Sequence, residues 1–181
     1  MSRFDDERYV RDYNRAEIYP RIHFDMHAMI NTVVGECKTF ADLGACTGLL
    51  SAYVANKKRR VFAIEANPRL INRAVKHDNI TWMRMRLTEA NFFRIPAGVD
   101  CVLARRVLPE ISDGNPQTIN ALAMTLHLLN VRYVILEGRV YSKRSTHTLS
   151  SADREAECFK KYYSVADHKN SVIKLVANAS V

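Results

Sequence analysis

The chain has 181 residues, of which 48% are hydrophobic and 25% are charged, a composition typical of a soluble globular protein. This length accommodates one domain with a hydrophobic core and excludes a catalytic domain joined to a separate recognition domain. The 27 Lys and Arg residues outnumber the 19 Asp and Glu residues, and the resulting net charge of +8 permits an anionic partner without requiring one.

The sequence contains no pattern of a membrane segment, a signal peptide or a metal site. Its longest apolar runs are a few residues, and residues 1–14 carry acids where a signal peptide needs an apolar core. The cysteines form no C-x-x-C pair and have no metal-ligand spacing with histidine; they are Cys37, Cys46, Cys101 and Cys158. We therefore expect a cytoplasmic protein with free thiols, no bound metal and no membrane partner.

Residues 1–37 are predicted to form a helical segment ahead of the first strand. From Phe4 to Ile22, tyrosines and arginines alternate with acids, and a second helical pattern runs from Phe24 to Val34. The stretch from Phe4 to Ile22 either folds as a lid over the ligand cleft expected at residues 39–68, or packs on the predicted sheet as an amphipathic helix.

The stretch of residues 39–68 has the pattern of a nucleotide-cofactor site. A short apolar strand leads into Asp42, Gly44 and Gly48 bracket a tight turn, and a helical pattern follows. The N-terminal N–H groups of that helix are expected to face the same cleft as the turn. A second strand then ends at Glu65, where a carboxylate suits a ribose diol.

The densest basic run, residues 57–60, lies between this helix and the second strand. In a doubly wound sheet that junction falls at the amino edge, opposite the cleft. The run is therefore either a solvated loop or a docking patch for nucleic acid.

The rest of the chain continues the alternation of helices and strands. The predicted helices are residues 68–76, 117–129 and one that begins at Ser150 or Ser151, and the predicted strands are residues 79–86, 99–104, 131–136, 162–167 and 171–176. The last two strands are separated by a short connection and predict a hairpin. We predict an α/β fold: a doubly wound, mostly parallel, seven-stranded sheet with an antiparallel terminal hairpin, in a three-layer sandwich.

Two motifs in the central stretch resemble those of the class I S-adenosyl-L-methionine (SAM) dependent methyltransferases. DLGACTG is similar to the D-x-G-x-G-x-G motif of that family, with Cys46 in place of the central glycine, and AIEANP is similar to its second motif. The resemblance covers about Thr39 to Ala177 and implies that residues 38–181 form a SAM-binding domain. It also implies a set of cofactor-binding residues, namely Asp42, Gly44, Ala45, Cys46, Gly48, Glu65, Ala66, Thr88, Glu89 and Ala104.

The methyl acceptor is less clearly marked. The residues after the strand 99–104 lack the [D/N]-P-P-[F/Y/W] motif of methyltransferases that act on exocyclic amines of bases, which disfavours that acceptor. Arg105, Arg106 and Arg139 each follow a strand and are expected at the carboxyl edge, where they would bind an anionic acceptor, either a small molecule or a nucleic acid. Alternatively, one or more of them would pair with Glu110, Glu137 or helix ends and never contact substrate. Tyr19 is a further candidate acceptor-binding residue, because the segment before the first strand often contributes to the acceptor pocket in the resembling family.

No residue is assigned a catalytic role, since a sulfonium methyl group is already activated and the protein mainly has to align the reactants. A SAM-binding or SAM-degrading protein of the same fold without methyl transfer is an alternative, and Cys46 leaves it open. An NAD(P)-dependent oxidoreductase is a third possibility, against which the absence of G-x-G-x-x-G argues.

Overall fold

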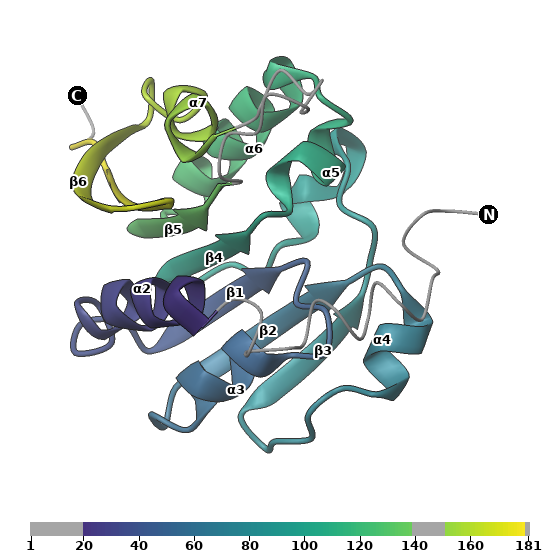
Figure 1. Ribbon diagram of the computed structural model, residues 1–181. Coiled ribbons are helices and arrows are strands. Elements are labelled where there is room, and N and C mark those ends of the chain that lie inside the picture. The colour runs from purple at the N-terminus through teal and green to yellow at the C-terminus, as the bar shows by residue number, and fades with distance from the viewer. Residues whose placement is uncertain (1–19, 139–150, 180–181) are drawn as a thin grey trace.

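The computed structural model describes residues 20–138 and 151–179, which form a seven-stranded sheet with the order β3-β2-β1-β4-β5-β7-β6 (Figure 1). The strands are β1 (Thr39–Leu43), β2 (Arg60–Glu65), β3 (Ile80–Arg84), β4 (Cys101–Arg105), β5 (Tyr133–Glu137), β6 (Tyr163–Lys169) and β7 (Val172–Ala177). Strands β1 to β5 pair in parallel, whereas β7 runs antiparallel to both β5 and β6. The predicted fold class, including the antiparallel terminal hairpin, is confirmed.

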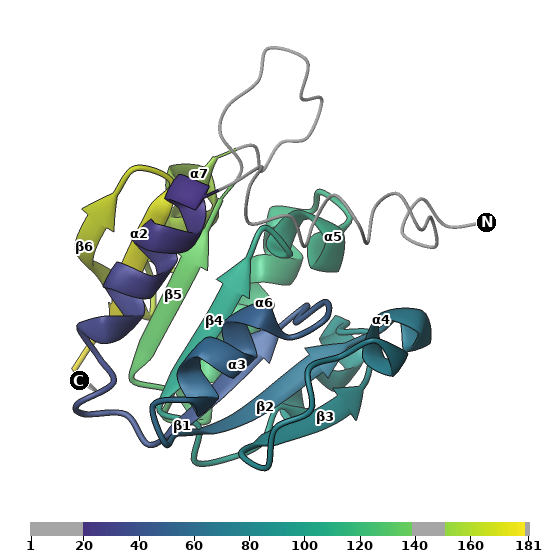
Figure 2. The ribbon, with the colours of Figure 1, turned by 60° about the horizontal axis from the view of Figure 1, so that its bottom comes forward.

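Helices cover both faces of this sheet and make a three-layer sandwich (Figure 2). They are α2 (Pro20–Asn31), α3 (Leu49–Ala55), α4 (Pro68–Asn72), the 3-10 helix η2 (Glu89–Arg94), α5 (Leu108–Ser112), α6 (Pro116–Leu128) and α7 (Ala152–Glu157). Helices α2 and α3 pack on one face, and η2, α5, α6 and α7 pack on the other. No helix in the two described ranges has the length and apolar character needed to cross a membrane.

The alternation of side chains along the central strands gives the sheet two separate cores. In β1, Phe40 is buried with the side chains of α2 and α3, while Ala41 is buried with those of α6 and η2. In β4, Leu103 and Val102 divide in the same way. Strands buried on both faces read as continuous apolar runs, which is why β4 and β5 were recognisable in the sequence.

Three helices begin where their capping residues indicate. The side chains of Asn67, Asn115 and Ser151 accept hydrogen bonds from backbone N–H groups in the first turns of α4, α6 and α7. Proline follows each asparagine at the first helical position, where its missing N–H has no cost. These are local interactions, so the sequence alone predicts them.

Other boundaries differ from the sequence prediction. The helix predicted over residues 68–76 ends at Asn72, because the chain turns back and the N–H of Val75 donates to the carbonyl of Thr47 in the glycine loop, 2.9 Å away. Helices α5 and η2 were not predicted. Both are short, and a run of five or six residues carries too little periodicity to be recognised.

The division into a segment of residues 1–37 and a domain of residues 38–181 stays a prediction. Residues 1–19, 139–150 and 180–181 lie outside the described residues, and with them Tyr19, Arg139 and most of the predicted lid. The described part of the segment is residues 20–37, and its helix α2 packs on the sheet through Met26, Met29 and Ile30.

Candidate functional site

A cavity of about 390 Å³ opens at the carboxyl edge of the parallel strands. It lies beside β1 and β4, between which the strand order of the sheet reverses. Ligands bind at this topological switch point in open α/β sheets, since the chain leaves the strands in opposite directions there. The described residues that line the cavity are Gly44, Cys46, Ile64, Glu65, Ala66, Asn67, Pro68, Leu70, Met85, Arg86, Leu87, Arg105, Arg106, Val107, Glu110 and Ile111. The volume lies in the usual range for small-molecule sites.

The glycine loop after β1 forms one wall of the cavity. Gly44 and Gly48 have positive φ angles of 67° and 84°, which glycine adopts without steric cost. Cys46, which stands where the resembling motif has glycine, also has a positive φ, 55°. A side chain is disfavoured in this conformation, so the loop geometry is imposed on Cys46 by its surroundings.

Glu65 is the residue that ties this loop to β2. One carboxylate oxygen accepts the backbone N–H of Cys46 at 2.9 Å, and the other accepts the backbone N–H of Asn67 at 2.8 Å. The side chain is 9% exposed and lines the cavity. A carboxylate has about four acceptor positions, so two backbone hydrogen bonds do not exhaust its capacity.

Asp42 lies in β1, one residue before the end of the strand, and is not among the residues that line the cavity. It is buried, and the hydroxyl of Ser51 in α3 donates to its carboxylate at 2.6 Å. Burial is the main cause that raises the pKa of Asp42 to about 6, and the hydrogen bond from Ser51 and the charge of Arg105 oppose the shift. Asp42 therefore links the end of β1 to α3.

Cys46 presents a thiol, and not a thiolate, to the cavity. Burial raises its pKa to about 11, and the neighbouring carboxylates of Glu65 and Asp42 act in the same direction. The side chain packs against Leu70 of α4. Since the thiolate is the reactive form of cysteine, the environment of Cys46 suits packing more than nucleophilic chemistry.

Gly48 has a packing role in the structure. A Cβ atom at this position would lie 2.7 Å from the indole ring of Trp82 in β3, a distance that real Cβ atoms do not show. Gly48 is not among the cavity-lining residues, whereas Gly44 is. The sequence could not separate these two roles, because Trp82 is distant along the chain.

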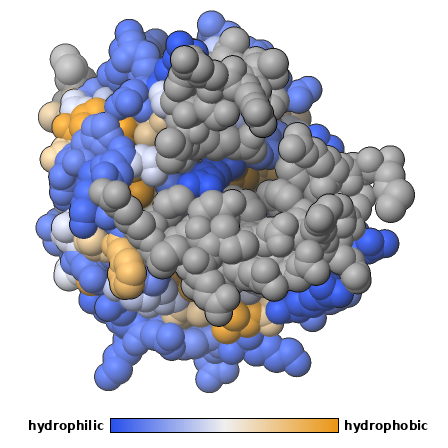
Figure 3. Space-filling model, viewed as in Figure 1, coloured by the Kyte–Doolittle hydropathy of each residue, from blue (hydrophilic) through white to orange (hydrophobic). Residues whose placement is uncertain are grey.

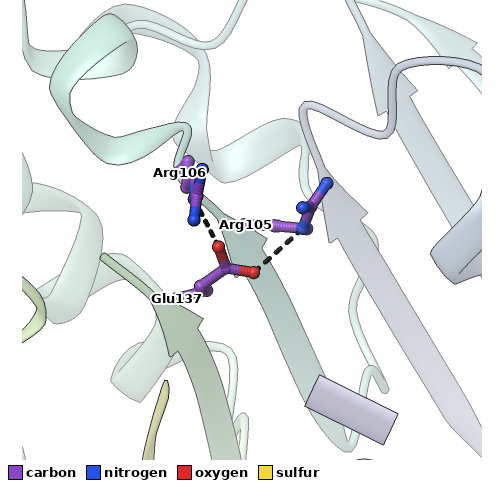
Figure 4. Close-up of polar contacts among 3 residues, drawn as sticks. All are labelled: Arg105, Arg106 and Glu137. Atoms are coloured by element: carbon purple, nitrogen blue, oxygen red, sulfur yellow. Dashed lines mark hydrogen bonds and ion pairs between the residues drawn. The ribbon is translucent and has the colours of Figure 1, made fainter. Parts of the chain in front are cut away.

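Arg105 and Arg106 meet at one buried carboxylate (Figure 4). The Nε of Arg105 donates to one oxygen of Glu137 at 2.9 Å, and the Nε of Arg106 donates to the other oxygen. Glu137 is fully buried, while both arginines also line the cavity. The pairing with Glu137 is therefore present, and both arginines also lie at the cavity wall; whether they contact an acceptor stays a prediction.

Several predicted cofactor residues do not line the cavity. Ala45 and Ala104 are buried in the two cores on either face of the sheet. Thr88 and Asn91 form the capping box of η2, and the carboxylate of Glu89 accepts the hydroxyl of Thr118 in α6. The described geometry brings Gly44, Cys46, Glu65 and Ala66 together at the cavity.

The cavity also has walls that the sequence did not indicate. Met85 and Leu87 follow β3, Val107 directly precedes α5, and Ile111 lies in the second half of α5. Apolar residues at the exit of a strand carry no motif, and α5 itself was not predicted. Only the tertiary arrangement could identify them.

Outside the cavity, the basic run is held by its neighbours. Arg59 donates to the carbonyl of Val34, Lys57 lies over the ring of Tyr53, and Arg60 stacks on a phenylalanine ring. Figure 3 shows a largely hydrophilic described surface on one side of the molecule, with hydrophobic residues in small separate patches. Within residues 20–138 and 151–179, no three His, Cys, Asp or Glu side chains are grouped so as to hold a metal ion.

No protein-family model matches the sequence, and no curated protein matches it. The fold does match solved structures. The N-methyltransferase NodS from Bradyrhizobium japonicum WM9 has a TM-score of 0.66 and 11% identity, over 87% of this chain and 97% of NodS. Magnesium protoporphyrin IX methyltransferase (ChlM) from Synechocystis PCC 6803, with bound SAM, has a TM-score of 0.67 and 14% identity, over 96% of this chain and 86% of ChlM.

The bifunctional kinase-methyltransferase WbdD has a TM-score of 0.69 and 17% identity, over 98% of this chain and 43% of WbdD. The chain thus spans less than half the length of that protein. Identities this low carry information about the fold and not about the reaction. The strand order and these matches together show that the chain has the class I SAM-dependent methyltransferase fold.

Proposed function

We propose that the protein is a SAM-dependent methyltransferase that binds SAM in the cavity at the carboxyl edge of β1, β2 and β4. The observation that carries the proposal is the link between Glu65 and the glycine loop. Glu65 at the tip of β2 and the loop after β1 line one cavity. The carboxylate of Glu65 accepts the backbone N–H groups of Cys46 in the loop and of Asn67, which fixes the position of the side chain relative to the loop.

The residues present fit the cofactor. Glu65 binds the ribose hydroxyls through its remaining acceptor positions. The backbone at Gly44 and Cys46 borders the methionine part, and Cys46 narrows that space without closing it, since the residue itself lines the open cavity. Thr88, Glu89 and Gly48 stay predictions as cofactor residues.

The chain's contribution to the reaction is alignment and exclusion of water. SAM, when bound, supplies an activated sulfonium methyl group. Some classes of acceptor therefore require no strong catalytic base. The cavity has apolar walls around the position proposed for the methyl group. They are formed by Met85, Leu87, Val107 and Ile111. Water excluded by such walls cannot compete with the acceptor.

The acceptor is proposed to carry an anionic group, because Arg105 and Arg106 lie at the cavity wall; Arg139 and Tyr19 are further proposed contacts. Both a small acid and a nucleic acid meet this description. Rising salt separates them: affinity for a nucleic acid bound through several phosphates falls steeply, whereas affinity for a small acid in a partly closed pocket falls much less. A cytoplasmic location is proposed as well, in keeping with four cysteines that are all free thiols.

Two measurements test the function. Calorimetry with SAM, S-adenosylhomocysteine and NAD should show binding of the first two ligands only, and binding of NAD alone would replace the proposal by an oxidoreductase. Transfer of label from methyl-labelled SAM into a cell extract should then occur with the wild type. Binding of SAM without any transfer would instead establish the alternative, a SAM-binding or SAM-degrading protein of this fold.

A variant pair makes the transfer assay specific. Glu65→Gln should lose most of the transfer at limiting SAM, since its side chain lines the cavity. Glu36→Gln is the matched control and should retain it, because that carboxylate pairs with the exposed Arg132 and does not line the cavity.

A further inference from the structure

We infer that Arg105, Arg106 and Glu137 form a subsite that binds a carboxylate within the cavity, with Glu137 as the positioning residue that holds the two guanidinium groups together. The inference rests on the proposed function for the identity of its ligands. It goes beyond that function by assigning a carboxylate to this part of the cavity. It also gives a role to Glu137, which is not among the residues that line the cavity.

The first observation is the direction of two successive side chains. Neighbouring residues in an extended strand point to opposite faces of a sheet, so two consecutive arginines would normally diverge. Here Arg105 is the last residue of β4, and Arg106 adopts a positive φ of 52°. That turn of the backbone brings both guanidinium groups to the same carboxylate.

The unusual backbone is held from the neighbouring strand. The N–H of Arg106 donates to the carbonyl of Glu137 at 2.7 Å, and Arg105 and Glu137 are partners in the register of β4 and β5. Residues in sparsely populated backbone regions persist where the surroundings fix them, and they concentrate at binding sites. The backbone and the side chain of Glu137 thus both act on the arginine pair.

The second observation is the chemistry of the pair. Glu137 is fully buried, and each of its oxygens accepts one Nε, which holds both guanidinium groups at the cavity wall. A guanidinium group has five N–H donors in a planar fork, a shape that matches a carboxylate. The carboxylate of Glu65, which also lines the cavity, is bonded to backbone N–H groups at the β2 end.

The third observation is the distance between the two ends of the cavity. Glu65 ends β2 and Arg105 ends β4, with β1 between them, which corresponds to roughly 10 Å at the usual strand spacing. A ligand whose ribose binds Glu65 can therefore extend an aliphatic chain toward the arginine pair. The carboxylate that arrives there comes either from the amino-acid end of the cofactor or from the acceptor.

Arginine side-chain NMR distinguishes these sources. In ¹⁵N-labelled protein, the Nε–H signals of Arg105 and Arg106 are assigned from Arg105→Gln and Arg106→Gln, each of which removes one signal. The probes are S-adenosylhomocysteine, 5′-methylthioadenosine, which has the nucleoside and the sulfur but no carboxylate, and sodium acetate. The signal of Arg132 is the control for general salt effects, since this arginine is exposed and pairs with Glu36 at the opposite edge of the sheet.

A shift of both signals with S-adenosylhomocysteine but not with methylthioadenosine supports the subsite and assigns it to the cofactor. Arg105→Gln should then weaken S-adenosylhomocysteine binding roughly ten- to a hundredfold and leave methylthioadenosine binding unchanged. A shift that appears only when acetate is added to the complex with S-adenosylhomocysteine supports the subsite and assigns it to the acceptor.

The inference is overturned if neither arginine responds to S-adenosylhomocysteine and if their response to acetate is no larger than that of Arg132. If neither nucleoside binds at all, the proposed function fails, and acetate added to the free protein still decides the subsite. Glu137→Gln tests the positioning role: the folded variant should lose the selective response to the carboxylate probe. An unchanged response in that variant would remove Glu137 from the subsite.

Discussion

Glu137→Gln is the substitution whose effect the structure predicts most sharply, because it removes a charge while keeping the shape of the side chain. The carboxylate has no exposed surface, and the arginines that it binds are 10% and 15% exposed. Breaking a buried ion pair by neutralising one partner costs about 3–5 kcal/mol. The two arginines retain some access to water, so we expect a loss of roughly 2–4 kcal/mol in the free energy of unfolding.

The matched control is Glu36→Gln. Glu36 pairs with Arg132 at 3.2 Å, but both side chains are more than half exposed. Exposed pairs contribute at most about 1 kcal/mol, so this variant should remain close to the wild type. The two substitutions are chemically identical, but their sites differ in burial and in partners, since Glu36 binds one arginine and the hydroxyl of Tyr133.

Urea denaturation at neutral pH measures the loss of unfolding free energy in both variants. The comparison requires that this free energy falls with urea concentration at the same slope in the wild type, Glu137→Gln and Glu36→Gln. In about 1 M salt the small effect of Glu36→Gln should shrink further, whereas the effect of Glu137→Gln should persist, because buried charges are poorly screened. A loss in Glu137→Gln no larger than that in Glu36→Gln would refute the assignment of a tightly held arginine pair.

Three further predictions concern the glycine loop and its carboxylates. Glu65→Ala should weaken S-adenosylhomocysteine binding by about 1–3 kcal/mol in calorimetry, with Glu36→Ala, which changes an exposed carboxylate outside the cavity, unchanged; equal losses in both would remove Glu65 from the site. Since burial raises the pKa of Asp42 to about 6, its carboxyl stabilises the fold at pH values below about 4, and this contribution disappears as the pH rises through 6. Asp42→Asn should therefore lose less stability than the wild type between pH 4 and pH 7, by roughly 2–3 kcal/mol in urea denaturation, and parallel pH profiles would contradict this. Gly48→Ala should lose about 1–3 kcal/mol of stability and shift the fluorescence of Trp82, because the added methyl group displaces the indole ring; an unaltered spectrum would show that the ring is not in contact.

The sequence alone determined the features that depend on neighbouring residues. Apolar runs in the central strands, asparagine caps followed by proline, and a glycine turn between a strand and a helix are local patterns. They led to the doubly wound sheet with its terminal hairpin, and to Glu65 at the tip of the second strand. The parallel order of the strands then places that tip and the loop at one edge, since carboxyl ends of parallel strands meet there.

The tertiary structure alone decided how distant residues share these positions. Glu137 lies 32 residues beyond Arg105, and only the register between β4 and β5, with the positive φ of Arg106, makes both arginines bind it. The contact of Gly48 with Trp82 likewise depends on packing between α3 and β3. Periodicity reports which face of an element is buried, but not which partner it meets. The physical reason is that such contacts are fixed by strand register and close packing, which arise only when the whole chain has folded.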